Sequence, residues 1–194
     1  MGLRILIADD EAIIRMGLRA MLMDLGHVVV GAARDGQQAV EMVREYNPDL
    51  AILDIRMPRL DGVDAANMIW ADRPIPIVLL TALSDRPTIE RARDSAVLAY
   101  LTKPVKEADL APTLAVAQAR FAERMALAAE QHSLRDAEML RDLLDRAKTR
   151  LMEEQGMTEP EAFKYIHYAS RRERRTMREV AEQILADASV APKV

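Results

Sequence analysis

Five polar side chains within the first 105 residues each stand at the end of a short apolar segment. They are Asp9, Asp10, Asp54, Thr81 and Lys103. Crowded carboxylates repel one another and favour a hard divalent cation, and Mg²⁺ suits such a place because it needs few protein ligands. A metal-bound Asp54 could attack a phosphorus atom, while the cation and Lys103 offset the charge on the transferring group. These residue types therefore predict a site for metal-assisted phosphoryl transfer.

The segments before these residues have the pattern of buried parallel strands, because each is short and apolar throughout. The expected strands are Leu3–Ala8, Val28–Ala32, Leu50–Leu53, Ile77–Leu80 and Ala99–Leu101. Amphipathic segments between them predict helices over Ile13–Leu25, Gln37–Tyr46, Val63–Trp70 and Thr88–Ser95. Five such units predict an α/β, flavodoxin-like fold with a doubly wound, five-stranded parallel sheet. In that strand order the ends of the first, third, fourth and fifth strands converge on one pocket.

Composition narrows the class of protein further. The chain has 194 residues, of which 50% are hydrophobic, so it can bury a sizeable core. It has no cysteine, which excludes disulfides and thiolate chemistry. No apolar stretch reaches the roughly 18 residues of a membrane span, and the start lacks a signal-peptide pattern, so we expect a cytoplasmic protein without a membrane partner. The net charge of −4 gives no general attraction to nucleic acid.

Four motifs within the first 105 residues carry a family resemblance. They are Ala8-Asp9-Asp10-Glu11, Leu53-Asp54-Ile55-Arg56-Met57-Pro58 with Asp61-Gly62, Thr81-Ala82, and Tyr100-Leu101-Thr102-Lys103-Pro104. With them, residues 3–105 resemble the receiver domain of two-component response regulators. The Lys103–Pro104 bond is a candidate cis peptide.

The resemblance implies a role for each of these residues. Asp54 would be the phosphoacceptor, and a sensor histidine kinase would be the partner that supplies the phosphoryl group. The implied Mg²⁺ ligands are Asp9, Asp10, Asp54 and the backbone carbonyl of Arg56. Thr81 and Lys103 would contact the phosphoryl group, and Tyr100 would be the aromatic switch residue. Because the sequence has no Gly-rich phosphate loop and no Ser/His/Asp constellation, we expect no catalysis on an external substrate.

From about Glu107 the pattern becomes helical. An apolar stripe at spacings of three and four runs from Leu110 to Leu151, which predicts one long helix, or two with a break around Gln131–Arg135. Pro112 lies near the expected helix start, where proline is tolerated. The stripe extends beyond the sheet, so we expect the helix to form a homodimer, with a fold back onto its own chain as the alternative.

Two short helices follow, and each begins with a capping box. Thr158 pairs with Glu161, and Thr176 pairs with Glu179. Gly156 is placed to end the preceding helix. The run Arg171-Arg172-Glu173-Arg174-Arg175 lies between the two expected helices.

The segment from Lys164 to Arg178 carries a local net charge of +5 on a chain that is acidic overall. A charge run can be an ordinary solvated face, but it can also be the electrostatic footprint of nucleic-acid binding. The adjacent Tyr165, His167 and Tyr168 could stack on unpaired bases, or could simply pack within a small helical domain.

A second resemblance covers about residues 140–185. The motifs are Ala147-Lys148-Thr149-Arg150-Leu151-Met152, Glu161-Ala162-Phe163, Ile166, Ala169 and Val180-Ala181. They resemble the ANTAR domain, an RNA-binding, antitermination-linked output module. The resemblance implies binding to hairpins in leader or nascent RNA, with transcription termination as the controlled step. The expected RNA contacts are Lys148, Arg171, Arg172, Arg174 and Arg175.

The predicted organisation is a receiver domain over residues 1–120, a helical coiled-coil linker over 121–139 and an all-α, three-helix ANTAR domain over 140–188. The alternative function is a DNA-binding transcriptional response regulator, since the end of the chain is helical and basic. The face of the last helix is mostly apolar or acidic, which is unlike a recognition helix. A protein-interaction module that uses only the long helix is the third possibility.

Overall fold

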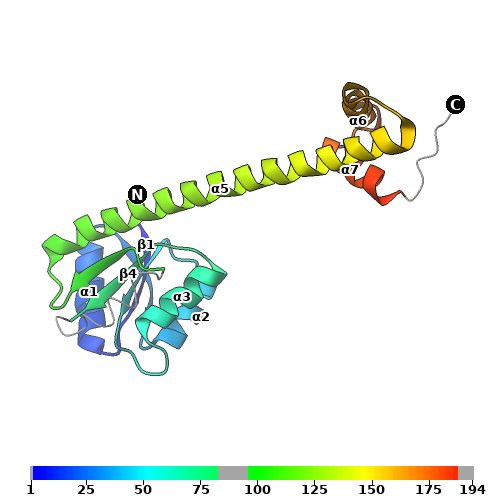
Figure 1. Ribbon diagram of the computed structural model, residues 1–194. Helices are drawn as coiled ribbons and strands as arrows, with labels where there is room; N and C mark the ends of the chain where they lie inside the picture. The colour runs from blue at the N-terminus through cyan, green and yellow to red at the C-terminus, as the bar shows by residue number, and fades with distance from the viewer. Residues whose placement is uncertain (1, 83–95, 188–194) are drawn as a thin grey trace. The chain divides into compact units, whose positions relative to one another are not determined.

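The computed structural model describes residues 2–82 and 96–187, and it forms two compact units (Figure 1). One unit extends to Met125, and the other begins at Ala126. The helix expected over Thr88–Ser95 lies outside the described residues.

The first unit is built on one parallel sheet. Its strands are β1 (Arg4–Ala8), β2 (Val28–Ala33), β3 (Leu50–Asp54), β4 (Ile77–Thr81) and β5 (Ala99–Thr102). They lie in the order β2-β1-β3-β4-β5, and every pair of neighbours is parallel. The predicted flavodoxin-like fold is confirmed, and each strand ends within one residue of its expected position. β3 and β4 are buried throughout, as their uniformly apolar sequences require.

Helices cover both faces of this sheet (Figure 1). The helices α2 (Gly36–Tyr46) and α3 (Gly62–Asp72) pack on one face, where Val40 and Ile69 join the core. The helix α1 (Ala12–Asp24) and the beginning of α5 cover the other face, with Leu18 and Leu114 among the buried side chains.

The long helix α5 runs unbroken from Glu107 to Gln155. The possible break around Gln131–Arg135 is absent. Pro112 is the sixth residue of α5, beyond the first turn, so the helix lacks the hydrogen bond that a residue at this position would donate to Ala108. The helix ends before Gly156, whose φ of +64° is a left-handed conformation that suits glycine.

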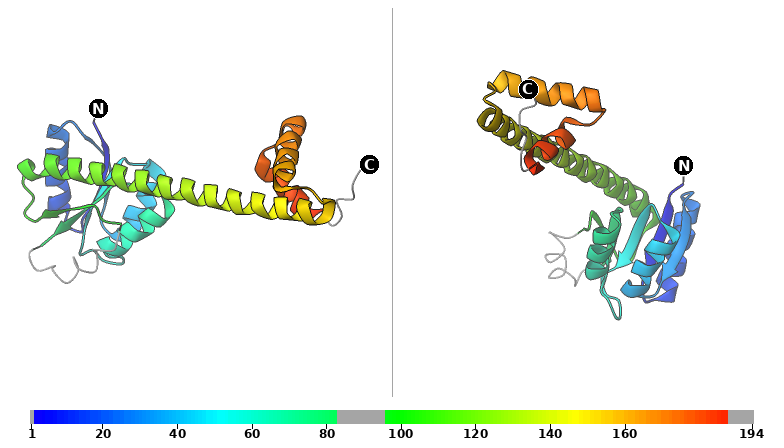
Figure 2. Two further views of the ribbon diagram at one scale, coloured as in Figure 1. Left: turned by 45° about the horizontal axis from the view of Figure 1, so that its top comes forward. Right: turned by 90° about the vertical axis from the view of Figure 1, so that its right-hand side faces the viewer.

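The second unit contains the end of α5 with α6 (Glu159–Glu173) and α7 (Met177–Ala186), and Figure 2 shows these three helices together. Both predicted capping boxes are present. The small core includes Leu151, Ile166 and Ile184.

The position of the basic run corrects one expectation. Arg171 and Arg172 lie in the last turn of α6 and not in the connection to α7. Arg174 follows as the C-cap residue with a φ of +54°, and only Arg174 and Arg175 of the four arginines belong to the connection. Cations suit the last turn of a helix because its free carbonyls carry partial negative charge.

Across the described ranges, none of the helices has both the length and the hydropathy that a bilayer crossing requires.

Candidate functional site

The carboxyl ends of the central strands bring the predicted pocket together. Asp9 follows β1, Asp54 ends β3 and Lys103 follows β5, and the strand order places these ends near one another. One carboxylate oxygen from each of Asp9, Asp10 and Asp54 lies within 4.8 Å of the other two. Asp9 is fully buried and Asp54 is 5% exposed, whereas Asp10 is exposed.

Lys103 neutralises part of this charge. Its Nζ lies 2.8 Å from Oδ2 of Asp9 and 2.8 Å from Oδ1 of Asp54. The other oxygen of Asp9 accepts a hydrogen bond from the backbone N–H of Glu11 at 2.9 Å. Arg15 donates to the backbone carbonyl of Asp9 at 2.6 Å and so holds the turn between β1 and α1. The Lys103–Pro104 peptide bond is cis, as predicted.

The pocket raises the pKa of both Asp54 and Lys103, but for different reasons. Burial raises the pKa of Asp54 above its ordinary value, and the Asp9 and Asp10 charges add to the rise, while the Lys103 ammonium opposes it. Burial works to lower the pKa of Lys103, but its hydrogen bonds with Asp54 and Asp9 outweigh burial, so this pKa is raised. Lys103 is therefore fully charged at neutral pH, and the Asp54 carboxylate gains from any further cation nearby.

The donor set fits Mg²⁺. Three carboxylates present oxygen atoms to one volume, and oxygen is the ligand atom that this cation prefers. Oδ2 of Asp9 is buried, and the ammonium of Lys103 is its partner in the structure. Arg56, whose backbone carbonyl is the fourth predicted ligand, is exposed in the loop that begins directly after Asp54.

Thr81 and Tyr100 occupy the neighbouring strands. Thr81 ends β4 and is 5% exposed, and its hydroxyl donates to the backbone carbonyl of Ala82 at 3.0 Å. Tyr100 lies in β5, half-buried, and burial raises the pKa of its phenol.

An ion pair that the sequence did not reveal holds the loop after Asp54. The fully buried Asp35 caps α2 by accepting from the backbone N–H of Gln38 at 2.9 Å, and its other oxygen pairs with Arg59 in the loop. A Cβ on Gly36 would lie 2.3 Å from the carbonyl oxygen of Leu60, so only glycine allows this approach of the loop to α2. The Asp35-Gly36 pair at a helix start is the one local signal for this arrangement.

The predicted RNA contacts in the second unit differ in their surroundings. Lys148 is largely covered, with its Nζ 2.7 Å from Oδ1 of Asp145 and 2.8 Å from Oε1 of Glu159. Arg175 bonds Gln183 and the backbone carbonyl of Glu179. Lys148 therefore ties α5 to α6, and Arg175 holds the α6–α7 connection against α7.

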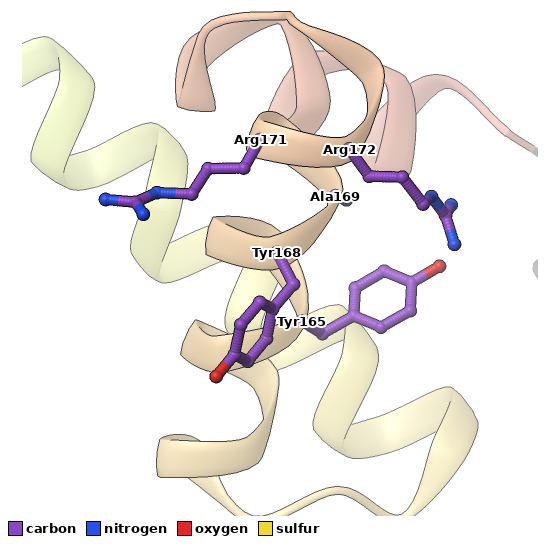
Figure 3. Close-up of a pocket in the computed structure, with 5 residues that line it drawn as sticks. All are labelled: Tyr165, Tyr168, Ala169, Arg171 and Arg172. Carbon is purple, nitrogen blue, oxygen red and sulfur yellow. The ribbon is translucent and has the colours of Figure 1, made fainter.

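Arg171 and Arg172 instead line a hollow of about 540 Å³ on the surface of α6, together with Tyr165, Tyr168 and Ala169 (Figure 3). Arg174, at the C-cap of α6, is not among these lining residues.

Comparison with known proteins identifies both halves of the chain. The response regulator receiver domain family matches residues 5–115, and the ANTAR domain family matches residues 132–185. The transcriptional regulatory protein PdtaR of Mycobacterium tuberculosis is 50% identical to this chain over 182 residues, which cover 94% of this chain and 89% of that protein.

Other similarities cover a smaller part of the chain. The DNA-binding response regulator MtrA of Mycolicibacterium paratuberculosis is 36% identical over 138 residues, which cover 70% of this chain and 59% of that protein. Among solved structures, the signal receiver domain of a modulated diguanylate cyclase from Desulfovibrio desulfuricans aligns with a TM-score of 0.60 and 30% identity. That alignment covers 64% of this chain and 99% of the solved chain.

Proposed function

The chain belongs to the response regulators that join a receiver domain to an ANTAR domain, and on that premise we propose that phosphorylation of Asp54 controls its binding to RNA hairpins. Transcription termination is the step that this binding regulates. The observation that carries the proposal is the pocket of three clustered carboxylates with Lys103 at 2.8 Å from two of them, on the same chain as a helical unit whose segment from Lys164 to Arg178 has a net charge of +5.

Asp54 is the nucleophile in this proposal. Its carboxylate oxygen forms a bond to the phosphorus of a phosphohistidine on a sensor histidine kinase, and the phosphorus–nitrogen bond breaks. Asp9, Asp10, Asp54 and the Arg56 carbonyl would hold Mg²⁺, which would supply positive charge to offset that of the phosphoryl group. Lys103 and Thr81 contact the phosphoryl group. Tyr100 is the aromatic switch residue, which responds to phosphorylation of Asp54.

The second unit supplies the output. Phosphate contacts dominate protein–nucleic acid affinity and make it fall with salt, so a locally basic surface on an acidic chain is well suited to the task. We assign RNA contacts to Lys148, Arg171, Arg172, Arg174 and Arg175. The domain division at 1–120, 121–139 and 140–188 is part of the proposal, as are a homodimer, a cytoplasmic location and the lack of an external substrate.

A DNA-binding response regulator is the second candidate, and MtrA, which is similar to this chain, is such a protein by name. The composition of α7 disfavours it. Arg178 is the one basic residue of that helix, while Glu179 and Glu182 are acidic, so α7 would meet a major groove with net negative charge.

Two measurements test the proposal. A small-molecule phosphodonor with Mg²⁺ should label the wild type and the control variant Asp24→Asn, which changes an exposed carboxylate at the end of α1, but not Asp54→Asn. A gel shift should then show that labelled protein binds hairpin RNA more tightly than duplex DNA. Equal labelling of Asp54→Asn would overturn the assignment of the phosphoacceptor, and equal competition by duplex DNA would favour the second candidate.

A further inference from the structure

One face of α6 combines aromatic and cationic side chains at helical spacing. Tyr165 and Tyr168 are three residues apart, and Arg172 follows Tyr168 by four, so all three lie on neighbouring positions of the helix surface. Arg171 lies three residues after Tyr168 and borders the same hollow. In Figure 3 the two arginines extend to opposite sides of the hollow, and both phenol rings lie toward the beginning of the helix.

These side chains are free to meet a ligand. Tyr168 is 66% exposed and Tyr165 is 40% exposed, although tyrosine normally covers much of its ring within a fold. Arg172 is paired with its neighbour Glu173 at 2.9 Å, but this contact between exposed side chains is of the weak surface kind. By contrast, the cations of Lys148 and Arg175 are held by groups of the same unit. Among the predicted RNA contacts, Lys148 and Arg175 are thus engaged within the unit, whereas Arg171 and Arg172 border the exposed hollow.

The chemistry of the hollow matches an unpaired nucleobase. A base has two flat π faces that stack on phenol or guanidinium planes, and its neighbouring phosphates attract guanidinium groups. The volume of about 540 Å³ lies in the range of small-ligand sites, about 300–1,000 Å³. A paired base within a duplex offers no free face, and an acidic peptide has no flat ring to stack on the tyrosines, so both fit the hollow less well.

We propose that the hollow on α6 lined by Tyr165, Tyr168, Arg171 and Arg172 binds one unpaired base of an RNA hairpin loop. The base stacks on the tyrosine rings, and the two arginines pair with the adjoining phosphates. This inference rests on the proposed function, and it adds which side chains of α6 form the subsite for one base and its adjoining phosphates.

The test uses the full chain, treated with a small-molecule phosphodonor and Mg²⁺, and a pool of RNA hairpins with one constant stem and randomised loops. From that pool a bound hairpin is isolated with the wild type. Tyr168→Ala should weaken binding of this hairpin by about 5- to 150-fold, the range for loss of one base–aromatic stack. Tyr168→Phe keeps the ring and should bind within about twofold of the wild type, which separates stacking from the hydroxyl group.

Salt dependence provides a readout that a merely structural role would not give. Tyr168→Ala removes no phosphate contact, so the slope of affinity against salt should equal that of the wild type. Arg172→Ala should reduce the slope by somewhat under one unit, while Arg172→Lys, which keeps the charge and the favourable position at the helix end, should retain it. A 2-aminopurine placed in the loop should lose fluorescence on binding the wild type but not Tyr165→Ala/Tyr168→Ala.

The outcomes distinguish this inference from the proposed function. If the wild type binds the hairpin and the double tyrosine variant, with an unchanged circular dichroism spectrum, binds it equally well, the base subsite is wrong and RNA binding stands. If the wild type retains no hairpin from the pool, both proposals are wrong. If the double variant loses its helical circular dichroism spectrum, the test uses the wild type and Tyr168→Phe with the 2-aminopurine hairpin instead. If neither protein lowers the 2-aminopurine fluorescence on binding, the base subsite is wrong.

Discussion

The surroundings of Asp54 disfavour the ionised form of its carboxyl group. Burial raises its pKa, and the nearby Asp9 and Asp10 act in the same direction, although the Lys103 ammonium opposes them. A raised pKa in the folded protein means that the folded state binds the proton more tightly than the unfolded chain does. The favourable contribution is therefore complete below the ordinary value of 3.8 and is lost as the pH rises through the folded pKa.

This electrostatic conflict predicts that Asp54→Asn is more stable than the wild type at neutral pH in the absence of divalent cations. The amide has the shape of the carboxylate without its charge, and Lys103 keeps Asp9 as a partner. The gain in free energy of unfolding should shrink as the pH falls toward 3.8, where the wild-type carboxyl takes up a proton. Urea denaturation with EDTA at the two pH values measures it, with Asp24→Asn as the control. A gain that is the same at both pH values would contradict this origin.

At the residue scale, sequence reasoning located the pocket but not all of its supports. Asp9, Asp10, Asp54 and Lys103 follow strands whose apolar pattern is unmistakable, so their convergence could be predicted. The partner of Asp35 could not be, because Arg59 is 24 residues away and only the folded loop brings the two together. Lys148 is expected to contact RNA, but its pairing with Glu159, eleven residues later, could not be predicted because that contact forms only when α6 packs against α5.

The pairing of Asp35 with Arg59 predicts unequal effects for two arginines. Arg59→Ala should lower the free energy of unfolding by about 1–3 kcal/mol, because it leaves an oxygen of the fully buried Asp35 without its partner. Arg34 approaches the same carboxylate only to 4.0 Å and is largely exposed, so Arg34→Ala should change stability by less than about 0.5 kcal/mol. Chemical denaturation of both variants measures the difference, and equal costs would show that the buried contact adds nothing.

At the scale of elements, the turn after α5 depends on one backbone conformation. Gly156 has a φ of +64°, which costs a residue with a Cβ about 1–2 kcal/mol, so Gly156→Ala should destabilise the second unit by about that amount. The matched control is Gly17→Ala within α1, where a Cβ would meet open space. There alanine should stabilise the helix by about 0.5–1 kcal/mol. Thermal unfolding should thus reveal opposite signs for one substitution, and a loss at both positions would contradict the conformational argument.

The element boundaries that sequence missed have a common physical reason. Charge and polarity do not end a helix by themselves. The polar stretch around Gln131–Arg135 lies on an exposed part of α5 that continues unbroken, and Arg171 and Arg172 extend α6 by a final turn. Where a boundary depends on a residue with a required conformation or a capping side chain, as at Gly156, Thr158 and Thr176, the sequence was sufficient.

At the scale of the whole molecule, the middle of α5 presents large apolar side chains to solvent. Leu127, Leu134 and Met139 are more than half exposed within their own chain. Leu127 and Leu134 are seven residues apart, the repeat of a two-stranded coiled coil. An exposed apolar stripe of this kind is the usual mark of an association surface.

We therefore expect Leu127→Glu/Leu134→Glu to sediment as a monomer at concentrations where the wild type is a dimer. Both substitutions lie on solvent-exposed positions, so phosphorylation of Asp54 by a small-molecule donor should be unaffected. The matched control is Asp136→Asn, an exposed position two residues after Leu134 and so on another face of the helix, which should leave the sedimentation of the protein unchanged. A monomeric wild type under phosphorylating conditions would show that the stripe has another use.

The contacts of Lys103 also decide which ions the pocket can accept. Among the described residues, the clustered side chains of the pocket are three carboxylates and one ammonium, an excess of two negative charges. A sodium or potassium ion would offset half of that excess, and a trivalent ion would exceed it, whereas one divalent ion brings the pocket to electroneutrality. In a buried setting an uncompensated charge is costly, so preference among cations follows first from this count. We therefore expect the pocket to bind divalent cations in preference to monovalent ones.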